Sequence, residues 1–346
     1  MSITRWSVEP SLPYEMLCFL NVLTSDPFYT TRYEAEYEHW RELMPANVTS
    51  AVATIKRVLK DERQTIISAK LCNIFSALPH LTVGTLRHVL SNRGVLFEAY
   101  CQSPYYTEED WQAVELIWDD VRTVLTFLEM QDFVGYWERV AGAAVSECIE
   151  RLTVEAPAYD IVPEVEARLG FQLPSPEITV YVVYFTQPHG MKLVGPRFIT
   201  SPRWPLDVTL RTAIHEMMHP PFPARDDAEL NDLIAGLTQD AFLMNRFEGH
   251  NPSFGYNTLV GLIEEDCVQA LDQIISERFG VGRDPSTRWQ ASDDGLHVFA
   301  VALYALMRQE PADARWPTFR DYLVNALRTT LRPGRIEALY RQVAEA

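Results

Sequence analysis

The pattern of apolar residues along the chain predicts a protein that is mainly helical. The clearest case is the segment from Thr107 to Gln131, whose apolar residues follow one another at spacings of three and four, as one helix face requires. Such a seam can pair in a coiled coil, but at this short length it is more typical of an intramolecular bundle. Similar patterns at about 48–70 and 133–152 predict that the region 1–152 is all helical. The seam consists of Trp111, Val114, Trp118, Val121, Leu125 and Leu128.

The pattern changes after Leu152, where short β-branched and aromatic runs replace the helical spacing. The segment Glu177–Phe185 predicts a buried strand. The segment Gly190–Thr200 carries Gly195-Pro196 between two short apolar runs, which predicts a strand, a turn and a second strand. The spacing is helical again from Asp207 onward. The sequence therefore predicts an α+β, mainly helical fold, in which a second domain at 153–346 contains a small sheet at about 177–203, a helix at about 207–219 and a helical subdomain at 226–346.

Composition and charge narrow the class of protein. Hydrophobic residues make up 47% and charged residues 22% of the 346 residues, which is ordinary for a globular protein. The net charge of −17 argues against binding to a nucleic-acid backbone, which draws on clustered Lys and Arg. No apolar run approaches the ~20 residues that a membrane span needs, and no secretory signal begins the chain. With five scattered cysteines, we expect a cytoplasmic protein with reduced thiols.

One motif carries most of the chemical information, namely His215-Glu216-Met217-Met218-His219. Two histidines at i and i+4 share one face of a helix, for which Asp207 offers an N-cap, and their imidazoles can occupy two corners of a tetrahedral metal site. The glutamate between them can take a proton from a metal-bound water. A chance match to this pattern is expected in only about one chain in a hundred of this composition.

The motif resembles that of the zincin metallopeptidases, which carry HExxH on a central helix packed against a small sheet. The resemblance covers about residues 175–280. The metzincin branch requires a further histidine six residues after the second, and Arg225 at that position excludes it. The gluzincin branch, with its thermolysin-like core, takes a glutamate from a later helix, and Glu264-Glu265 offers one. The resemblance therefore implies a bound Zn²⁺, a peptide or protein substrate and a hydrolytic reaction.

The third zinc ligand has two adjacent candidates, Glu264 and Glu265. Glu264 lies closer to the apolar face of the predicted helix. The family pattern favours Glu265, because apolar residues then recur at +2, +5, +6 and +9 from the ligand. Gln269 and Asp272 share the face of Glu265 and can orient a ligand histidine. We predict Glu265, with these four apolar positions occupied by Cys267, Ala270, Leu271 and Ile274.

The resemblance also assigns roles in catalysis. Glu216 acts as general base toward the attacking water, and a Tyr or His stabilises the oxyanion. Two other functions stay open: a non-catalytic helical binding protein that retains a zincin-like core, and a metal-dependent hydrolase of a non-peptide amide. Because Pro220 follows the motif directly, the helix is expected to end or kink at His219. The candidate oxyanion helpers are Tyr256, His250, His297 and Tyr304.

Overall fold

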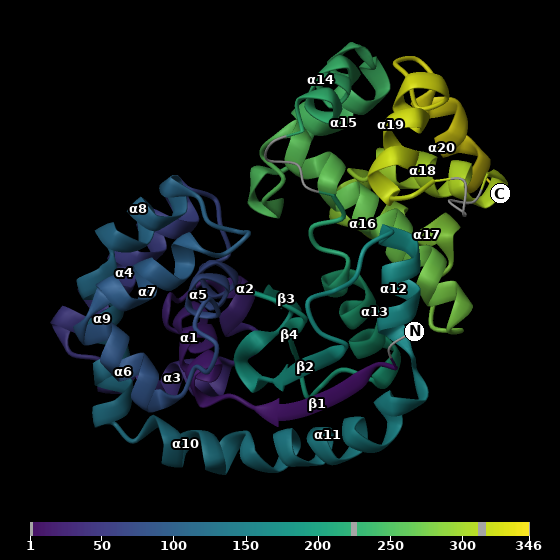
Figure 1. The fold of residues 1–346 in the computed structure, drawn as a ribbon. Coiled ribbons are helices and arrows are strands. Elements are labelled where there is room, and N and C mark those ends of the chain that lie inside the picture. Colours follow the sequence, from purple (N-terminus) through teal and green to yellow (C-terminus); the bar gives the residue numbers. More distant parts are fainter. Residues whose placement is uncertain (1–2, 223–226, 311–315, 346) are drawn as a thin grey trace. The chain divides into compact units, whose positions relative to one another are not determined.

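A computed structural model describes residues 3–222, 227–310 and 316–345, which form a mainly helical protein with one four-stranded mixed sheet (Figure 1). This confirms the predicted α+β, mainly helical class. The chain divides into two compact units. The sheet unit comprises Arg5–Pro157 and Glu177–Thr209, and the helical unit comprises Met1–Thr4, Ala158–Pro176 and Leu210–Ala346.

The sheet combines three parallel strands with one antiparallel edge strand, in the order β1-β2-β4-β3. Its central pair, β2 and β4, comes from the two segments that the sequence predicts as strands, and Gly195, at φ 76°, makes the turn between β3 and β4. The predicted pairing of these segments is therefore confirmed. The strands are β1 (Arg5–Pro10), β2 (Glu177–Val182), β3 (Met191–Leu193) and β4 (Arg197–Thr200).

The prediction that residues 1–152 are all helical is wrong at the start of the chain. There β1 pairs with β2 in parallel, with Trp6 opposite Ile178. A six-residue strand whose partner lies about 170 positions away has no local signal, because the pairing itself stabilises it. The pairing of β1 with β2 joins the N-terminal region to the sheet. The two compact units therefore do not meet at residue 152, where the sequence predicts a domain boundary.

The remaining elements are helices, as predicted. In the sheet unit they are α1 (Leu12–Leu23), α2 (Pro27–Thr30), α3 (Glu34–Leu43), α4 (Ala46–Ile55), α5 (Ile67–Phe75), α6 (Val83–Ser91), α7 (Arg93–Cys101), α8 (Glu108–Leu116), α9 (Trp118–Met130), α10 (Phe133–Val140) and α11 (Gly142–Glu155), with a π-helical turn at Lys56–Glu62. Within this unit α11 runs along β1 (Figure 1).

The predicted helix from Thr107 to Gln131 is two helices, α8 and α9, which meet at Ile117 (φ −103°, ψ 8°). Thr107 is the N-cap of α8, since its hydroxyl accepts a hydrogen bond from the Asp110 N–H at 3.1 Å. All six residues of the apolar seam are buried within the chain itself. This confirms an intramolecular bundle and not a coiled-coil partner surface.

Strand β2 ends at Val182, three residues earlier than predicted, because a buried carboxylate takes over the next backbone donors. Glu15 of α1 is fully buried and accepts the Tyr184 N–H at 2.6 Å and the Phe185 N–H at 3.0 Å. These two N–H groups are therefore directed at α1, and residues 184–186 form a short 3₁₀ turn instead of continuing the strand.

We expect Glu15→Ala to destabilise the protein by about 2–5 kcal/mol, because it leaves two buried N–H groups without acceptors. Glu15→Gln should cost less, since its amide oxygen still accepts one of them. Urea unfolding measures both. Equal stability of Glu15→Ala and wild type would contradict this account of the strand end.

The helical unit surrounds α16, which contacts α12, α14 and α18. Residue 226, where the predicted helical subdomain begins, lies outside the described residues, and helices follow from Ala228 onward. No described helix combines the length and the apolar composition that crossing a membrane requires. The helices are α12 (Ile161–Leu169), α14 (Ala228–Gly236), α15 (Ala241–Gly249), α16 (Leu259–Arg278), α17 (Pro285–Ala291), α18 (Val298–Gln309), α19 (Phe319–Thr329) and α20 (Ile336–Ala344), while α13 (Leu206–Met217) runs from one unit into the other.

Candidate metal centre

Helix α13 carries the first part of the HExxH motif. One face of this helix is buried and consists of Leu210, Ile214 and Met217. The side chain of His215 is partly exposed to solvent. Asp207 lies within the first turn and not at the N-cap as predicted, because the helix already begins at Leu206. An acidic side chain in a first turn still stabilises the positive end of the helix dipole.

The predicted extent of this helix, to residue 219, is wrong by two residues. α13 ends at Met217, and His219 lies in the turn that follows. The physical reason is Pro220, which disfavours the α conformation for the residue before it. The Met218 N–H still donates to the His215 carbonyl at 3.1 Å, so the chain turns sharply and keeps His219 next to His215.

Three side chains from α13, its following turn and α16 meet at one point. The Nε2 atoms of His215 and His219 lie 3.2 Å apart. Glu265 of α16 places Oε1 at 3.6 Å from His215 Nε2 and Oε2 at 3.5 Å from His219 Nε2. Zinc bonds of about 2.0–2.1 Å at tetrahedral angles separate ligand atoms by about 3.4 Å. The two imidazole nitrogens and the Glu265 carboxylate therefore lie close enough together to hold one metal ion, with a carboxylate oxygen at about this separation from each nitrogen.

The structure brings Glu265, and not Glu264, to the two histidines. Glu264 is half-buried one residue earlier on α16, where burial and the charge of Glu265 raise its pKa to about 7. This is the residue that the resemblance to the gluzincin branch implies. That these three residues bind a metal stays a prediction.

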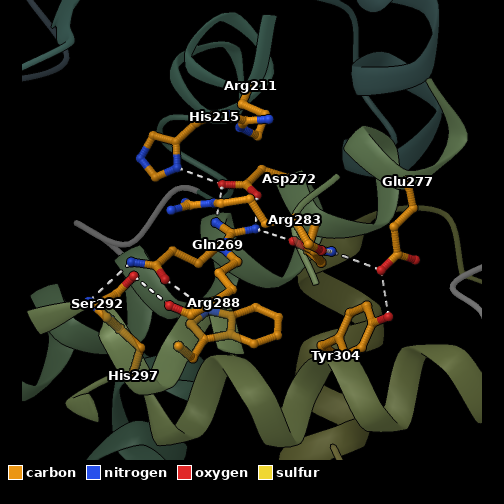
Figure 2. A network of polar contacts seen from close by, with 12 residues as sticks. Arg211, His215, Gln269, Asp272, Glu277, Arg283, Arg288, Ser292, His297 and Tyr304 are labelled. Carbon is orange, nitrogen blue, oxygen red and sulfur yellow. Dashed lines mark hydrogen bonds and ion pairs between the residues drawn. The ribbon is translucent and has the colours of Figure 1, made fainter. Parts of the chain in front are cut away.

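Asp272 orients His215 from the side away from the cluster. Its Oδ2 lies 2.8 Å from His215 Nδ1, so the imidazole donates there and its Nε2 faces Glu265 and His219. Arg288 binds both oxygens of Asp272, and the two side chains are 4% and 5% exposed (Figure 2). Although burial opposes it, Arg288 and His215 hold the pKa of Asp272 down at about 2.

The cluster favours a positive charge at its centre. Burial alone would lower the pKa of His215, but Glu265 and Asp272 together with the nearby Glu216 raise it to about 9. Glu216 is 8% exposed, and its carboxylate also contributes to the raised pKa of Tyr256. These acidic groups, which attract a proton here, attract a metal cation by the same electrostatics.

We expect Asp272→Asn to lower zinc affinity by about 10- to 100-fold, the range typical for outer partners of ligand histidines. The side-chain oxygen of asparagine can still accept a hydrogen bond from His215, but the neutral amide forms no ion pair with Arg288. Competition with a chromophoric chelator measures the affinity. Glu277→Gln, on the same helix but bonded to Tyr304, is the control. Equal affinities of the two variants would contradict the role of Asp272.

Of the four candidate oxyanion helpers, three are engaged elsewhere. His297 is 0% exposed, with its two ring nitrogens held by Asp266 and Asp293. The Tyr304 hydroxyl donates to Glu277 at 2.6 Å (Figure 2). His250 follows the end of α15, and its Nδ1 pairs with the Phe247 carbonyl of that helix.

Tyr256 is the candidate that the structure favours. Its ring packs edge-on against His297, with the ring centroids 5.2 Å apart. Burial and the carboxylates of Glu265, Asp293, Asp266 and Glu216 raise its pKa well above the usual range, so the phenol lies in the electrostatic field of the cluster and stays protonated. A protonated phenol beside a metal cluster can donate a hydrogen bond to a negatively charged oxygen.

Sequence reasoning missed Arg288 and Trp289, which stand behind the cluster on α17. Arg288 follows a capped helix start at Asp284, a pattern that predicts an ordinary surface helix. Its burial comes from pairing with Asp272, sixteen residues away, and no local signal marks it. The only signal in the sequence is that an acidic residue on one helix, Asp272, is followed by an arginine on the next, and many such pairs never meet.

No protein-family model, no curated protein and no solved structure matches this chain. A function for this protein is therefore argued from the geometry of the cluster.

Proposed function

We propose that the protein is a zinc-dependent hydrolase, most simply a peptidase, with a zincin-like core of the gluzincin type. The observation that supports this most is the convergence of His215, His219 and Glu265. The two Nε2 atoms lie 3.2 Å apart, and one oxygen of Glu265 lies 3.6 Å from His215 Nε2 and the other 3.5 Å from His219 Nε2. Two histidines and one carboxylate are the ligand set of several catalytic zinc sites, which keep a fourth position open.

The chemical roles follow from the residues around this cluster. Bound Zn²⁺ would supply Lewis acidity toward a carbonyl and toward the attacking water. Glu216 accepts the proton of that water and delivers it to the leaving amine. Tyr256 donates a hydrogen bond to the oxygen that becomes negative as the carbonyl is attacked. Asp272 keeps His215 in the tautomer whose Nε2 is free to bind a metal.

The test is a digest of a peptide library with zinc-loaded protein, read by mass spectrometry. We expect cleavage that stops when a chelator removes the metal and returns when about one equivalent of Zn²⁺ is restored. Cleavage that persists without metal would contradict the proposal. Zinc binding without cleavage would favour a non-peptide amide substrate or a binding protein, and either result rejects the peptidase.

A further inference from the structure

The side-chain amide of Gln269 connects Glu265 to a buried group of polar side chains behind it. Gln269 follows Glu265 by one turn of α16, and its Nε2 donates to Glu265 Oε1 at 2.9 Å. It is 7% exposed, so protein groups rather than water surround the amide. Asp272 thus accepts a hydrogen bond from His215, and Gln269 donates one to the carboxylate of Glu265.

Two partners of opposite kind fix the orientation of this amide. The indole N–H of Trp289 can only donate, and it lies 2.9 Å from Gln269 Oε1. An ionised Glu265 can only accept, and it faces Nε2. Turning the amide over would set donor against donor at Trp289 and oxygen against oxygen at Glu265. The N–H of Gln269 therefore points at Glu265 Oε1.

A buried histidine closes the space behind the amide. The Nε2 of His297 lies 3.1 Å from Gln269 Nε2 (Figure 2). His297 is itself held by Asp266 at 2.6 Å and by Asp293 at 2.9 Å. The second oxygen of Asp266 accepts the N–H of Ala300, at the start of α18, at 3.0 Å. Gln269 is thus packed against a histidine that is anchored at the start of a neighbouring helix.

We propose that Gln269 is a positioning residue that makes Glu265 bind metal through Oε2 alone, an inference that rests on the proposed function. The hydrogen bond withdraws electron density from Oε1 and fixes the rotation of the carboxylate. Both oxygens face the histidines, Oε1 at 3.6 Å from His215 Nε2 and Oε2 at 3.5 Å from His219 Nε2. What distinguishes them is that Oε1 accepts the Gln269 N–H, so Oε2 is the oxygen left to bind a metal. A single oxygen from Glu265 gives three protein donors and keeps the fourth tetrahedral corner for water or substrate. A carboxylate bound through both oxygens would occupy that corner.

Gln269→Met tests this role, because methionine has a similar length but donates no hydrogen bond. Co²⁺ is the probe, since four-coordinate Co²⁺ absorbs visible light much more strongly than Co²⁺ of higher coordination number. We expect an about 10- to 100-fold lower Co²⁺ affinity and a weaker visible spectrum. Gln309→Met, at an exposed position on α18, should match wild type in both measurements. Trp289→Phe releases the anchor of the amide and should shift the spectrum in the same direction by less.

The outcomes separate this inference from the proposed function. Wild-type affinity and spectrum in folded Gln269→Met would overturn the positioning role and leave the metal site standing. If Gln269→Met fails to fold, Trp289→Phe decides, and an unchanged Co²⁺ spectrum there overturns the proposal. A wild-type protein that binds neither Co²⁺ nor Zn²⁺ would remove the proposed function together with this inference.

Discussion

Replacing Glu216 by glutamine is expected to lower peptide hydrolysis by about 10²- to 10⁴-fold, the usual contribution of a general base, while the protein keeps its zinc. An amide has nearly the shape of a carboxylate but cannot take a proton from water. Glu216 stands outside the set of three donor side chains, so its replacement removes no ligand. The kcat/KM for a peptide identified in the library digest, together with the zinc content, measures both effects.

The matched control for this variant is Glu264→Gln, the same substitution at a half-buried acid beside the cluster. It should retain wild-type activity and zinc. Loss of zinc from folded Glu216→Gln would show that Glu216 is a ligand and not a base. Undiminished hydrolysis by the same variant would remove it from catalysis altogether.

The second large effect concerns the ligands. We expect alanine at His215, His219 or Glu265 to abolish stable zinc binding, a loss well beyond the about 10- to 100-fold typical of outer partners. Each substitution removes one of three donors and leaves two, which do not define a tetrahedral site. Zinc content after gel filtration and affinity by chelator competition measure the loss.

Two controls accompany the ligand variants. His80→Ala removes a histidine from an exposed loop and should leave zinc binding unchanged. Glu264→Ala should also keep zinc. If Glu264→Ala lost zinc while Glu265→Ala kept it, the assignment on α16 would be wrong by one residue.

The two histidines could be chosen from the sequence because one short motif carries both of them. HExxH places both histidines one turn apart. Helical periodicity alone favours Glu264, and it is the resemblance to the gluzincin branch that implies Glu265. The structure brings the two histidines and Glu265 together even though His219 lies beyond the end of α13. The i, i+4 spacing thus tolerates a helix that stops early, because the following turn still directs His219 inward.

The parts that sequence reasoning missed depend on contacts between distant positions. Strand β1 exists because β2 pairs with it, and β2 stops where Glu15 takes its next two N–H groups. Likewise Gln269, which the sequence suggests as a partner of a ligand histidine, donates to Glu265 instead, and Trp289 and His297 beside it come from distant positions. Local periodicity predicts which face of a helix is buried, but not which polar group it meets.

The central claim is that this chain binds one catalytic zinc through His215, His219 and Glu265. Elemental analysis of the purified full-length protein, after dialysis against metal-free buffer, tests it most directly. We predict about one zinc per chain in the wild type and none in His215→Ala. A wild-type protein that stays folded, contains no zinc and takes up none when Zn²⁺ is supplied would contradict the claim.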